Sequence, residues 1–220
     1  MKREEVCALI REIGILPSVR VSSQDLAYFA ADTVYSAGIP ILEITLTVPG
    51  AMEVISSLAK RYPTLAVGAG TVLDEDSAMR CVDSGARFLT SPGYIPEVVA
   101  YARKADVTVL PGALTPTEII AAWKAGSDFV KIFPTGQVGG IQYVRALKIP
   151  LPQIPLIATG GVNQQNATDF ILAGATAIGV GGELLPREAL HFRQVDRIHE
   201  LASRFLSMVR DARQLRETYY

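Results

Sequence analysis

The segment Phe129-Val-Lys-Ile-Phe-Pro-Thr135 places one lysine among four apolar residues, and Pro134 ends the run. If the segment is a strand, Lys131 lies on the same face as Phe129 and Phe133. Lysine is rarely buried without a reason. Burial disfavours the ammonium form, so a buried lysine has a lowered pKa and can attack a carbonyl carbon. Lys131 is therefore a candidate Schiff-base nucleophile. The alternative is a lysine at a strand end whose ammonium group reaches water.

Short apolar runs recur on both sides of this segment and alternate with amphipathic runs. The expected strands span residues 15–21, 41–45, 65–72, 87–91, 107–111, 129–133, 155–160 and 177–181. The expected helices span residues 3–13, 23–36, 51–61, 74–84, 95–104, 115–126, 140–147, 163–174 and 194–215, with Ser23 and Asn163 as N-caps. Strands that are apolar throughout are typical of parallel strands covered by helices.

Eight strands at nearly regular spacing predict a (β/α)8 barrel, a TIM barrel preceded by an N-terminal helix at residues 3–13. A doubly wound open sheet is the alternative. The barrel is preferred because the eight units are nearly equal and none carries a long insertion. We expect residues 1–220 to form a single domain, which is an ordinary length for such a barrel.

The composition narrows the classes of partner. The chain has 220 residues, is 49% hydrophobic and has a formal net charge of −1, so there is no basic surplus for nucleic acid. No run approaches the ~18 apolar residues of a membrane span. Cys7 and Cys81 are too few and too far apart for a disulfide framework or a zinc site, which favours a reduced cytoplasmic setting.

In such a barrel the chemistry lies at the carboxyl ends of the strands. Polar residues occur at these ends: Arg20, Glu43, Thr45, Thr71, Ser91, Lys131 and Thr159. Glu43 sits in the otherwise apolar segment Ile41-Leu-Glu-Ile-Thr45, and a buried carboxylate must be paired, neutralised or functional. Glu43 is therefore a candidate for proton transfer. The alternative is a structural ion pair with Arg20 or Lys131.

Glycine pairs end the last two strands, Gly160 and Gly161 at the seventh and Gly181 and Gly182 at the eighth. Glycines expose backbone N–H groups, and the N-terminus of a following helix adds positive partial charge. Phosphate sites in barrels frequently use these two loops, so we expect phosphate binding here. The alternative is glycine used only for tight turns.

The segment Gly68-Ala-Gly-Thr71 lacks the third glycine of a dinucleotide fingerprint. We interpret it as a place of close backbone approach inside the barrel. The hydroxyl of Thr71 is then free for a ligand.

Six short motifs together resemble the family of 2-keto-3-deoxy-6-phosphogluconate (KDPG) aldolase and 4-hydroxy-2-oxoglutarate (KHG) aldolase. They are Leu42-Glu-Ile-Thr45, Val67-Gly-Ala-Gly-Thr-Val72, Thr90-Ser-Pro-Gly93, Leu110-Pro-Gly112, Val130-Lys-Ile-Phe-Pro134 and Ala158-Thr-Gly-Gly-Val162. The resemblance covers residues 15–186 and implies a class I aldolase on a (β/α)8 barrel. It further implies no metal, no cofactor, a small keto acid substrate and usually a homotrimer.

By this resemblance Lys131 is the Schiff-base lysine and Glu43 the proton shuttle. Thr71 is then expected to hold the pyruvyl carboxylate, and Phe133 to pack on the enamine. Thr159, at the end of the seventh strand, is a further candidate for substrate binding. The expected reaction is cleavage of KDPG to pyruvate and glyceraldehyde 3-phosphate.

Two positions depart from the family pattern. Many members carry arginine where this chain has Thr47, and Arg20 resembles an arginine of other members that can bind the carboxylate instead. Many members carry serine where this chain has Gly182, so one hydroxyl to the phosphate is absent. Cleavage of KHG to pyruvate and glyoxylate is therefore an alternative. Another is a barrel that only binds a phosphorylated metabolite, with Lys131 as a phosphate ligand.

Overall fold

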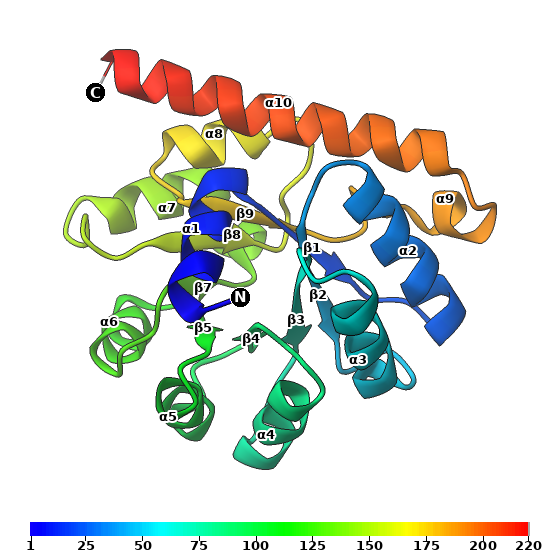
Figure 1. The fold of residues 1–220 in the computed structure, drawn as a ribbon. Coiled ribbons are helices and arrows are strands. Elements are labelled where there is room, and N and C mark those ends of the chain that lie inside the picture. Colours follow the sequence, from blue (N-terminus) through cyan, green and yellow to red (C-terminus); the bar gives the residue numbers. More distant parts are fainter. Residues whose placement is uncertain (220) are drawn as a thin grey trace.

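Parallel strands form the centre of the fold and helices cover their outer face in the computed structural model, which describes residues 1–219 (Figure 1). The strands are β1 Ile15–Val19, β2 Ile41–Thr45, β3 Ala66–Gly70, β4 Phe88–Thr90, β5 Thr108–Leu110, β6 Gly112–Ala113, β7 Val130–Ile132, β8 Leu156–Thr159 and β9 Ala177–Val180. The helices are α1 Arg3–Ile13, α2 Gln24–Ser36, α3 Ala51–Arg61, α4 Glu75–Asp83, α5 Pro96–Lys104, α6 Pro116–Lys124, α7 Gly140–Lys148, α8 Ala167–Leu172, α9 Arg187–His191 and α10 Val195–Tyr219, with a 3₁₀ turn η1 at Thr135–Val138.

The fifth strand of the barrel is interrupted at Pro111, between β5 and β6. Proline has no N–H to give to a neighbouring strand, but its carbonyl accepts the N–H of Lys131 at 2.9 Å. β5 pairs with β4 and β6 pairs with β7, so the two pieces act as one strand. The strand order runs from β5 through β1 and β9 to β6 and closes a ring of eight parallel strands. The predicted (β/α)8 barrel is confirmed, and the open doubly wound sheet is wrong.

Several helices begin where the sequence predicts them. The Oγ of Ser23 accepts the N–H of Leu26 at 3.2 Å and caps α2. Thr115 caps α6 in a capping box with Glu118.

The helix after β8 begins later than predicted. Oδ1 of Asn163 accepts the N–H groups of Gln165 and Asn166, so Asn163 forms a turn instead of capping a helix. As a result α8 begins only at Ala167. The 3₁₀ turn η1 and the short helix α9 were also not predicted.

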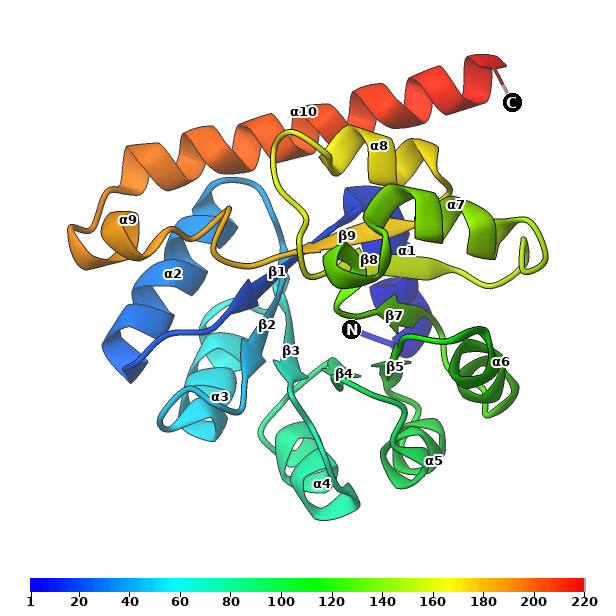
Figure 2. The same ribbon diagram turned by 180° about the vertical axis from the view of Figure 1, so that it is seen from behind.

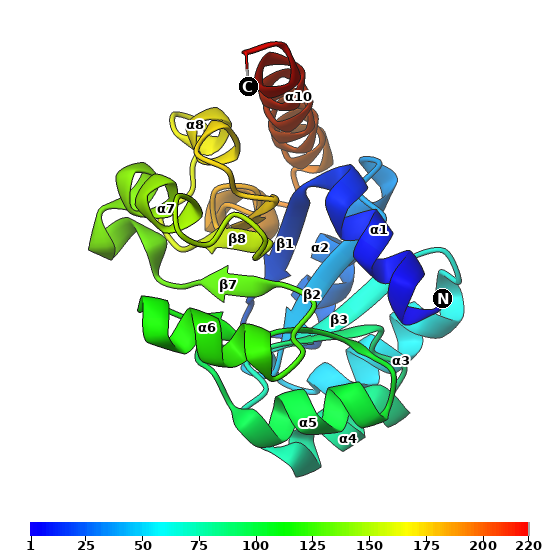
Figure 3. The same ribbon diagram turned by 90° about the vertical axis from the view of Figure 1, so that its left-hand side faces the viewer.

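Helix α1 crosses one end of the barrel. Figure 3 shows it where β2 and β3 begin, so that their arrowheads point away from it. The opposite end, seen in Figure 2, holds the carboxyl ends of the strands. Helix α10 runs along the outside against α2 and α8, and Arg213 donates to the carbonyl oxygens of Glu12 and Thr176.

None of the helices formed by residues 1–219 has the length and apolar character needed to cross a membrane.

Candidate active site

An amine and a carboxylate meet inside the barrel. Lys131 extends from β7 and Glu43 from β2, and the two residues are 8% and 3% exposed. Nζ of Lys131 lies 3.8 Å from Oε1 of Glu43, which is an ion-pair distance longer than a hydrogen bond. Of the two ion-pair partners expected for Glu43, the structure provides Lys131. Arg20 is not a partner.

The carboxylate of Glu43 accepts a hydroxyl hydrogen on each oxygen. Ser18 Oγ donates to Oε1 at 2.7 Å, and Thr90 Oγ1 donates to Oε2 at 2.5 Å. Neither hydroxyl was predicted from the sequence as part of the site. Strand alternation offers a signal for Ser18, since it lies two residues before Arg20 and on the same strand face. Thr90 lies next to Ser91 at the end of β4, within a motif already singled out.

The backbone is approached closely at Gly68–Thr71, as predicted, and the groups that approach it are side chains. A Cβ at Gly68 would lie 2.3 Å from the ring of Phe88. A Cβ at Gly70 would lie 3.0 Å from the carboxyl carbon of Glu43. The first glycine therefore makes room for a core ring, and the second makes room for the carboxylate. Thr71 follows with φ of 63°, a strained value for a residue that is not glycine.

Two further predicted residues lie near the lysine. Nζ of Lys131 is 5.5 Å from the ring centroid of Phe133. Thr159 lies on the same face of the barrel, because Ile157 pairs in register with Lys131 and Thr159 is two residues further on. The Oγ1 of Thr159 is buried, and it has no hydrogen-bond partner among residues 1–219. A buried hydroxyl without a partner is unusual, which keeps Thr159 a candidate for contact with a ligand.

Arg20 follows β1 and is exposed. Its side chain has no ion pair or hydrogen bond within the described part of the chain, so the structure does not bring it into contact with Lys131 or Glu43. Thr47 is also exposed, and its hydroxyl shares a hydrogen bond of 2.8 Å with Thr45. The geometry therefore leaves the arginine free to bind an anion, but shows no fixed position for it.

The two glycine loops follow neighbouring strands, β8 and β9, at their carboxyl ends. Gly160 accepts the N–H of Gly136 at 2.8 Å, and a Cβ at Gly161 would lie 2.9 Å from the Cα of Gly136. The N–H groups of Gly161 and Gly182 have no acceptor among residues 1–219.

The expected helix N-termini do not follow these loops directly. Helix α8 begins only at Ala167 and α9 only at Arg187. Any anion here would therefore be held by loop N–H groups, without a helix N-terminus immediately after the glycines.

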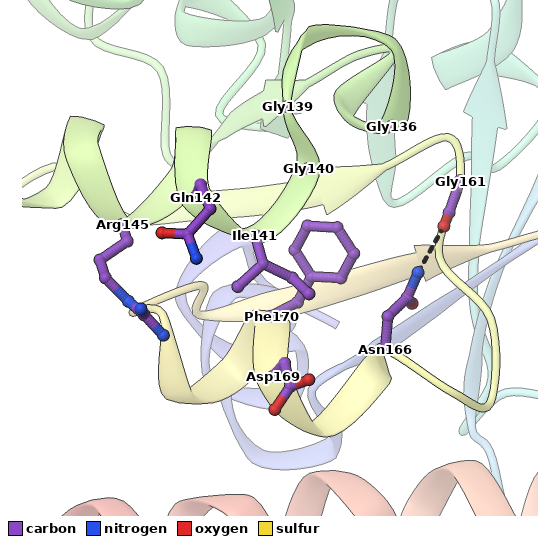
Figure 4. A pocket seen from close by; sticks show the side chains of 10 residues that line it. All are labelled: Gly136, Gly139, Gly140, Ile141, Gln142, Arg145, Gly161, Asn166, Asp169 and Phe170. Carbon is purple, nitrogen blue, oxygen red and sulfur yellow. Dashed lines mark hydrogen bonds between the residues drawn. The ribbon is translucent and has the colours of Figure 1, made fainter.

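A cavity of about 510 Å³, not predicted from the sequence, lies beside the first glycine loop, between α7 and α8 (Figure 4). Its lining comprises Gly136, Gly139, Gly140, Ile141, Gln142, Arg145, Gly161, Asn166, Asp169 and Phe170. Asn166 donates through Nδ2 to the carbonyl oxygen of Gly161 at 2.8 Å, which fixes one wall. Lys131 and Glu43 are not part of the lining, so the cavity is distinct from the buried pair.

Comparison with known proteins adds the following findings. A model of the family "KDPG and KHG aldolase" matches residues 6–201. The 2-dehydro-3-deoxy-phosphogluconate aldolase of Pseudomonas aeruginosa is 33% identical over 209 residues, which cover 93% of this chain and 94% of that protein. The KHG/KDPG aldolase of Escherichia coli K12 is 31% identical over 189 residues, covering 86% and 88%.

A solved structure extends the similarity to three dimensions. It is the KDPG aldolase of Legionella pneumophila with pyruvate captured at low pH as a covalent carbinolamine intermediate. Its identity to this chain is 28%, and its TM-score is 0.83, with 89% of this chain and 95% of that chain covered.

Proposed function

The chain belongs to the KDPG and KHG aldolase family, and we propose that it is a class I aldolase that cleaves KDPG to pyruvate and glyceraldehyde 3-phosphate. It is accordingly a carbon–carbon lyase. The observation that carries this proposal is the buried pair formed by Lys131 and Glu43, 3.8 Å apart inside the barrel.

Lys131 is the proposed nucleophile. Its uncharged amine attacks the 2-keto carbon of the substrate to give a carbinolamine, which loses water to become an iminium. The iminium is an electron sink for the step that follows. Support comes from the Legionella relative, whose structure holds pyruvate as a covalent carbinolamine.

Glu43 is the proposed proton shuttle. Its carboxylate takes the proton from the C4 hydroxyl while the C3–C4 bond breaks and its electron pair moves toward the iminium nitrogen. The aldehyde leaves and an enamine remains. Protonation at C3 restores the iminium, and water then releases pyruvate and the free amine of Lys131.

The pyruvyl part of the substrate is assigned to four residues. Thr71 and Arg20 would bind the carboxylate, and Phe133 would pack on the enamine. Thr159 would donate or accept through its buried hydroxyl, which has no other partner among residues 1–219. Arg20 would have to turn toward the carboxylate from its exposed position.

The phosphate is assigned to the N–H groups of the two glycine loops. Gly160 and Gly161 follow β8, and Gly181 and Gly182 follow β9, its direct neighbour in the sheet. Neighbouring strands bring their carboxyl ends together, and several N–H groups can then bind one anion.

KHG is the alternative substrate, to be cleaved to pyruvate and glyoxylate. Gly182 favours this alternative, because a hydroxyl expected in the phosphate loop is absent. The E. coli relative bears both names. A barrel that only binds a phosphorylated metabolite is disfavoured, since a buried carboxylate beside Lys131 would repel the phosphate.

We also infer a homotrimer, a cytoplasmic location and one cooperative domain. The trimer rests on the family resemblance, and light scattering tests it. The location rests on two buried free cysteines, Cys7 and Cys81, and fractionation of cells tests it. The single domain is supported by the pairing of β1 with β9 and predicts one unfolding transition.

Pyruvate release from a panel of substrates tests the proposed function. KDPG, its unphosphorylated counterpart and KHG should be compared by kcat/KM. KDPG is expected to have the highest value. Equal kcat/KM values for KDPG and its unphosphorylated counterpart would favour KHG as the substrate. Failure to release pyruvate from any of the three would contradict the assignment as an aldolase.

A further inference from the structure

The carboxylate of Glu43 is held from two sides. A carboxylate can only accept hydrogen bonds, so the hydroxyls of Ser18 and Thr90 must both be donors. Each takes a different oxygen, at 2.7 Å on Oε1 and 2.5 Å on Oε2. Two bonds to two oxygens fix both the position and the rotation of the carboxylate plane, which a single bond would not do.

The strand order explains how one carboxylate reaches both hydroxyls. Ser18 on β1 pairs in register with Glu43 on β2, so the two are direct neighbours. Thr90 lies on β4, and β3 stands between β4 and β2. β3 contributes Gly70 at this point, and a Cβ there would lie 3.0 Å from the carboxyl carbon. The side chain of Glu43 can therefore lie over Gly70 and reach Thr90.

This arrangement keeps the carboxylate of Glu43 close to the amine of Lys131 without a hydrogen bond between them. Oε1 is 3.8 Å from Nζ of Lys131 and already accepts the hydrogen of Ser18. An ammonium group that donates directly to a carboxylate has no lone pair with which to attack a carbonyl. A carboxylate offers about four lone-pair sites, so each oxygen retains one for proton transfer.

We infer that Ser18 and Thr90 are positioning residues that clamp the Glu43 carboxylate for proton transfer in the aldolase reaction. The inference rests on the proposed function, because it assigns the clamp to the proton shuttle of that reaction. The hydroxyls act through Glu43 and do not touch the substrate. A misplacement of a reacting group by about 1 Å can cost ~10²-fold in rate, so a clamp of this kind has a measurable effect.

The experiment removes each hydroxyl at nearly constant volume, with Ser18→Ala and Thr90→Val. Four quantities are measured in the folded enzyme: kcat and KM for pyruvate release, exchange of the pyruvate methyl hydrogens in deuterium oxide, and borohydride trapping of pyruvate on Lys131. Methyl exchange reports proton transfer at C3 and needs no aldehyde. We expect kcat and exchange to fall together by roughly 10- to 100-fold, with KM and trapping retained.

Variants that retain the hydroxyl separate positioning from packing. Ser18→Thr and Thr90→Ser should recover most of the exchange rate. Thr108→Val is the matched control, since this buried hydroxyl on β5 donates to the carbonyl of Arg3, near the other end of the barrel. It should leave exchange unchanged even if the protein becomes less stable.

A double variant decides whether the hydroxyls act through the carboxylate. In a Glu43→Gln background, Thr90→Val should cause no further loss of methyl exchange. A further loss there, or near wild-type exchange in both single variants, overturns the clamp while leaving the aldolase assignment intact. Failure of the wild-type enzyme to trap pyruvate on Lys131 would overturn the proposed function, and the clamp with it.

Discussion

Nζ of Lys131 lies 3.8 Å from Oε1 of Glu43, and the two side chains are only 10% and 4% exposed. At this distance the charges attract each other, but no hydrogen bond joins them. The barrel thus keeps an amine and a carboxylate available for separate tasks. In the proposed reaction, the amine would bond to the substrate while the carboxylate transfers protons.

Borohydride added with pyruvate should reduce the iminium and leave a covalent adduct on Lys131. Peptide mass spectrometry locates the adduct, and Lys131→Met should abolish both trapping and turnover. Lys148→Met is the matched control, because Lys148 is a partly buried lysine elsewhere in the fold whose pKa is lowered by burial. Its Nζ is bonded to loop carbonyl oxygens such as that of Pro152, so trapping should persist. An adduct on any other lysine would remove the Schiff-base assignment.

Glu43→Gln should retain trapping but lose most of kcat. General acid–base catalysis contributes ~10²–10⁴-fold, and an amide cannot take up the proton. Stopped assays of pyruvate release give the rate, and Glu53→Gln on the outer helix α3 should behave like wild type. Turnover near the wild-type rate in Glu43→Gln would mean that the carboxylate is structural.

Arg20→Ala should raise KM for keto acid substrates while changing kcat less. Loss of a hydrogen bond between charged groups removes about 1.5–3 kcal/mol, which is roughly tenfold or more in binding. Steady-state kinetics measures the effect. Arg80→Ala, on the exposed face of α4, controls for the change in net charge. If KM does not move, another group binds the carboxylate.

Gly182 provides a test of the proposed phosphate site that does not strain the backbone. A Cβ there meets nothing within 4 Å, whereas one at Gly161 would strike Gly136. Gly182→Asp should erase the preference for KDPG over its unphosphorylated counterpart, because a carboxylate repels phosphate. Gly182→Ser should raise the preference about tenfold or less, the value of one neutral hydrogen bond.

Gly182→Ala controls for the added side-chain volume and should leave the preference for KDPG over its unphosphorylated counterpart unchanged. If Gly182→Ala, Gly182→Ser and Gly182→Asp each change kcat/KM equally for the two substrates, the phosphate does not bind near Gly182.

Glu118 gives a stability prediction that depends on pH. Its carboxylate accepts the N–H groups of Leu114 and Thr115, and these bonds lower its pKa below the ordinary 4.5. A lowered folded-state pKa gives stability that is present above pH 4.5 and is lost as pH falls through the folded pKa. Glu118→Gln should therefore destabilise the protein by only a few tenths of a kcal/mol at neutral pH, because the carboxylate is exposed to solvent and Gln keeps an acceptor oxygen for the capping box.

Urea unfolding at neutral pH and well below pH 4.5 measures this difference, which should shrink in acid. Glu97→Gln, in the first turn of α5 without a side-chain cap, should have little effect at either pH. A constant difference at both pH values would contradict the assignment.

The fold could be read from the sequence because each unit carries its own local signals. The β2 and α3 spans predicted at residues 41–45 and 51–61 agree with the structure at both ends. The prediction that Asn163 caps a helix was wrong, because the same side chain that caps a helix can also close a turn. Two shorter elements, η1 and α9, have too few residues to produce a periodic pattern.

The site was less predictable than the fold. Lys131 and Glu43 stand out because a charge in an apolar strand is costly. Ser18 and Thr90 do not stand out, since hydroxyl residues are ordinary in strands and their role depends on which strands become neighbours. The cavity beside Gly161 depends on how α7 and α8 pack, and no local sequence signal encodes that relationship.

The closed ring also has a consequence for how the chain reaches its native state. β1 is made early during synthesis, but Ile15 pairs with Ile178 of β9, close to the end of the chain. One edge of β1 therefore stays unpaired until β9 has left the ribosome. Closure over such a long separation is slow, and a free edge can recruit another chain. The finished barrel has no free edge, so the nascent chain bears a risk of aggregation that the native enzyme does not.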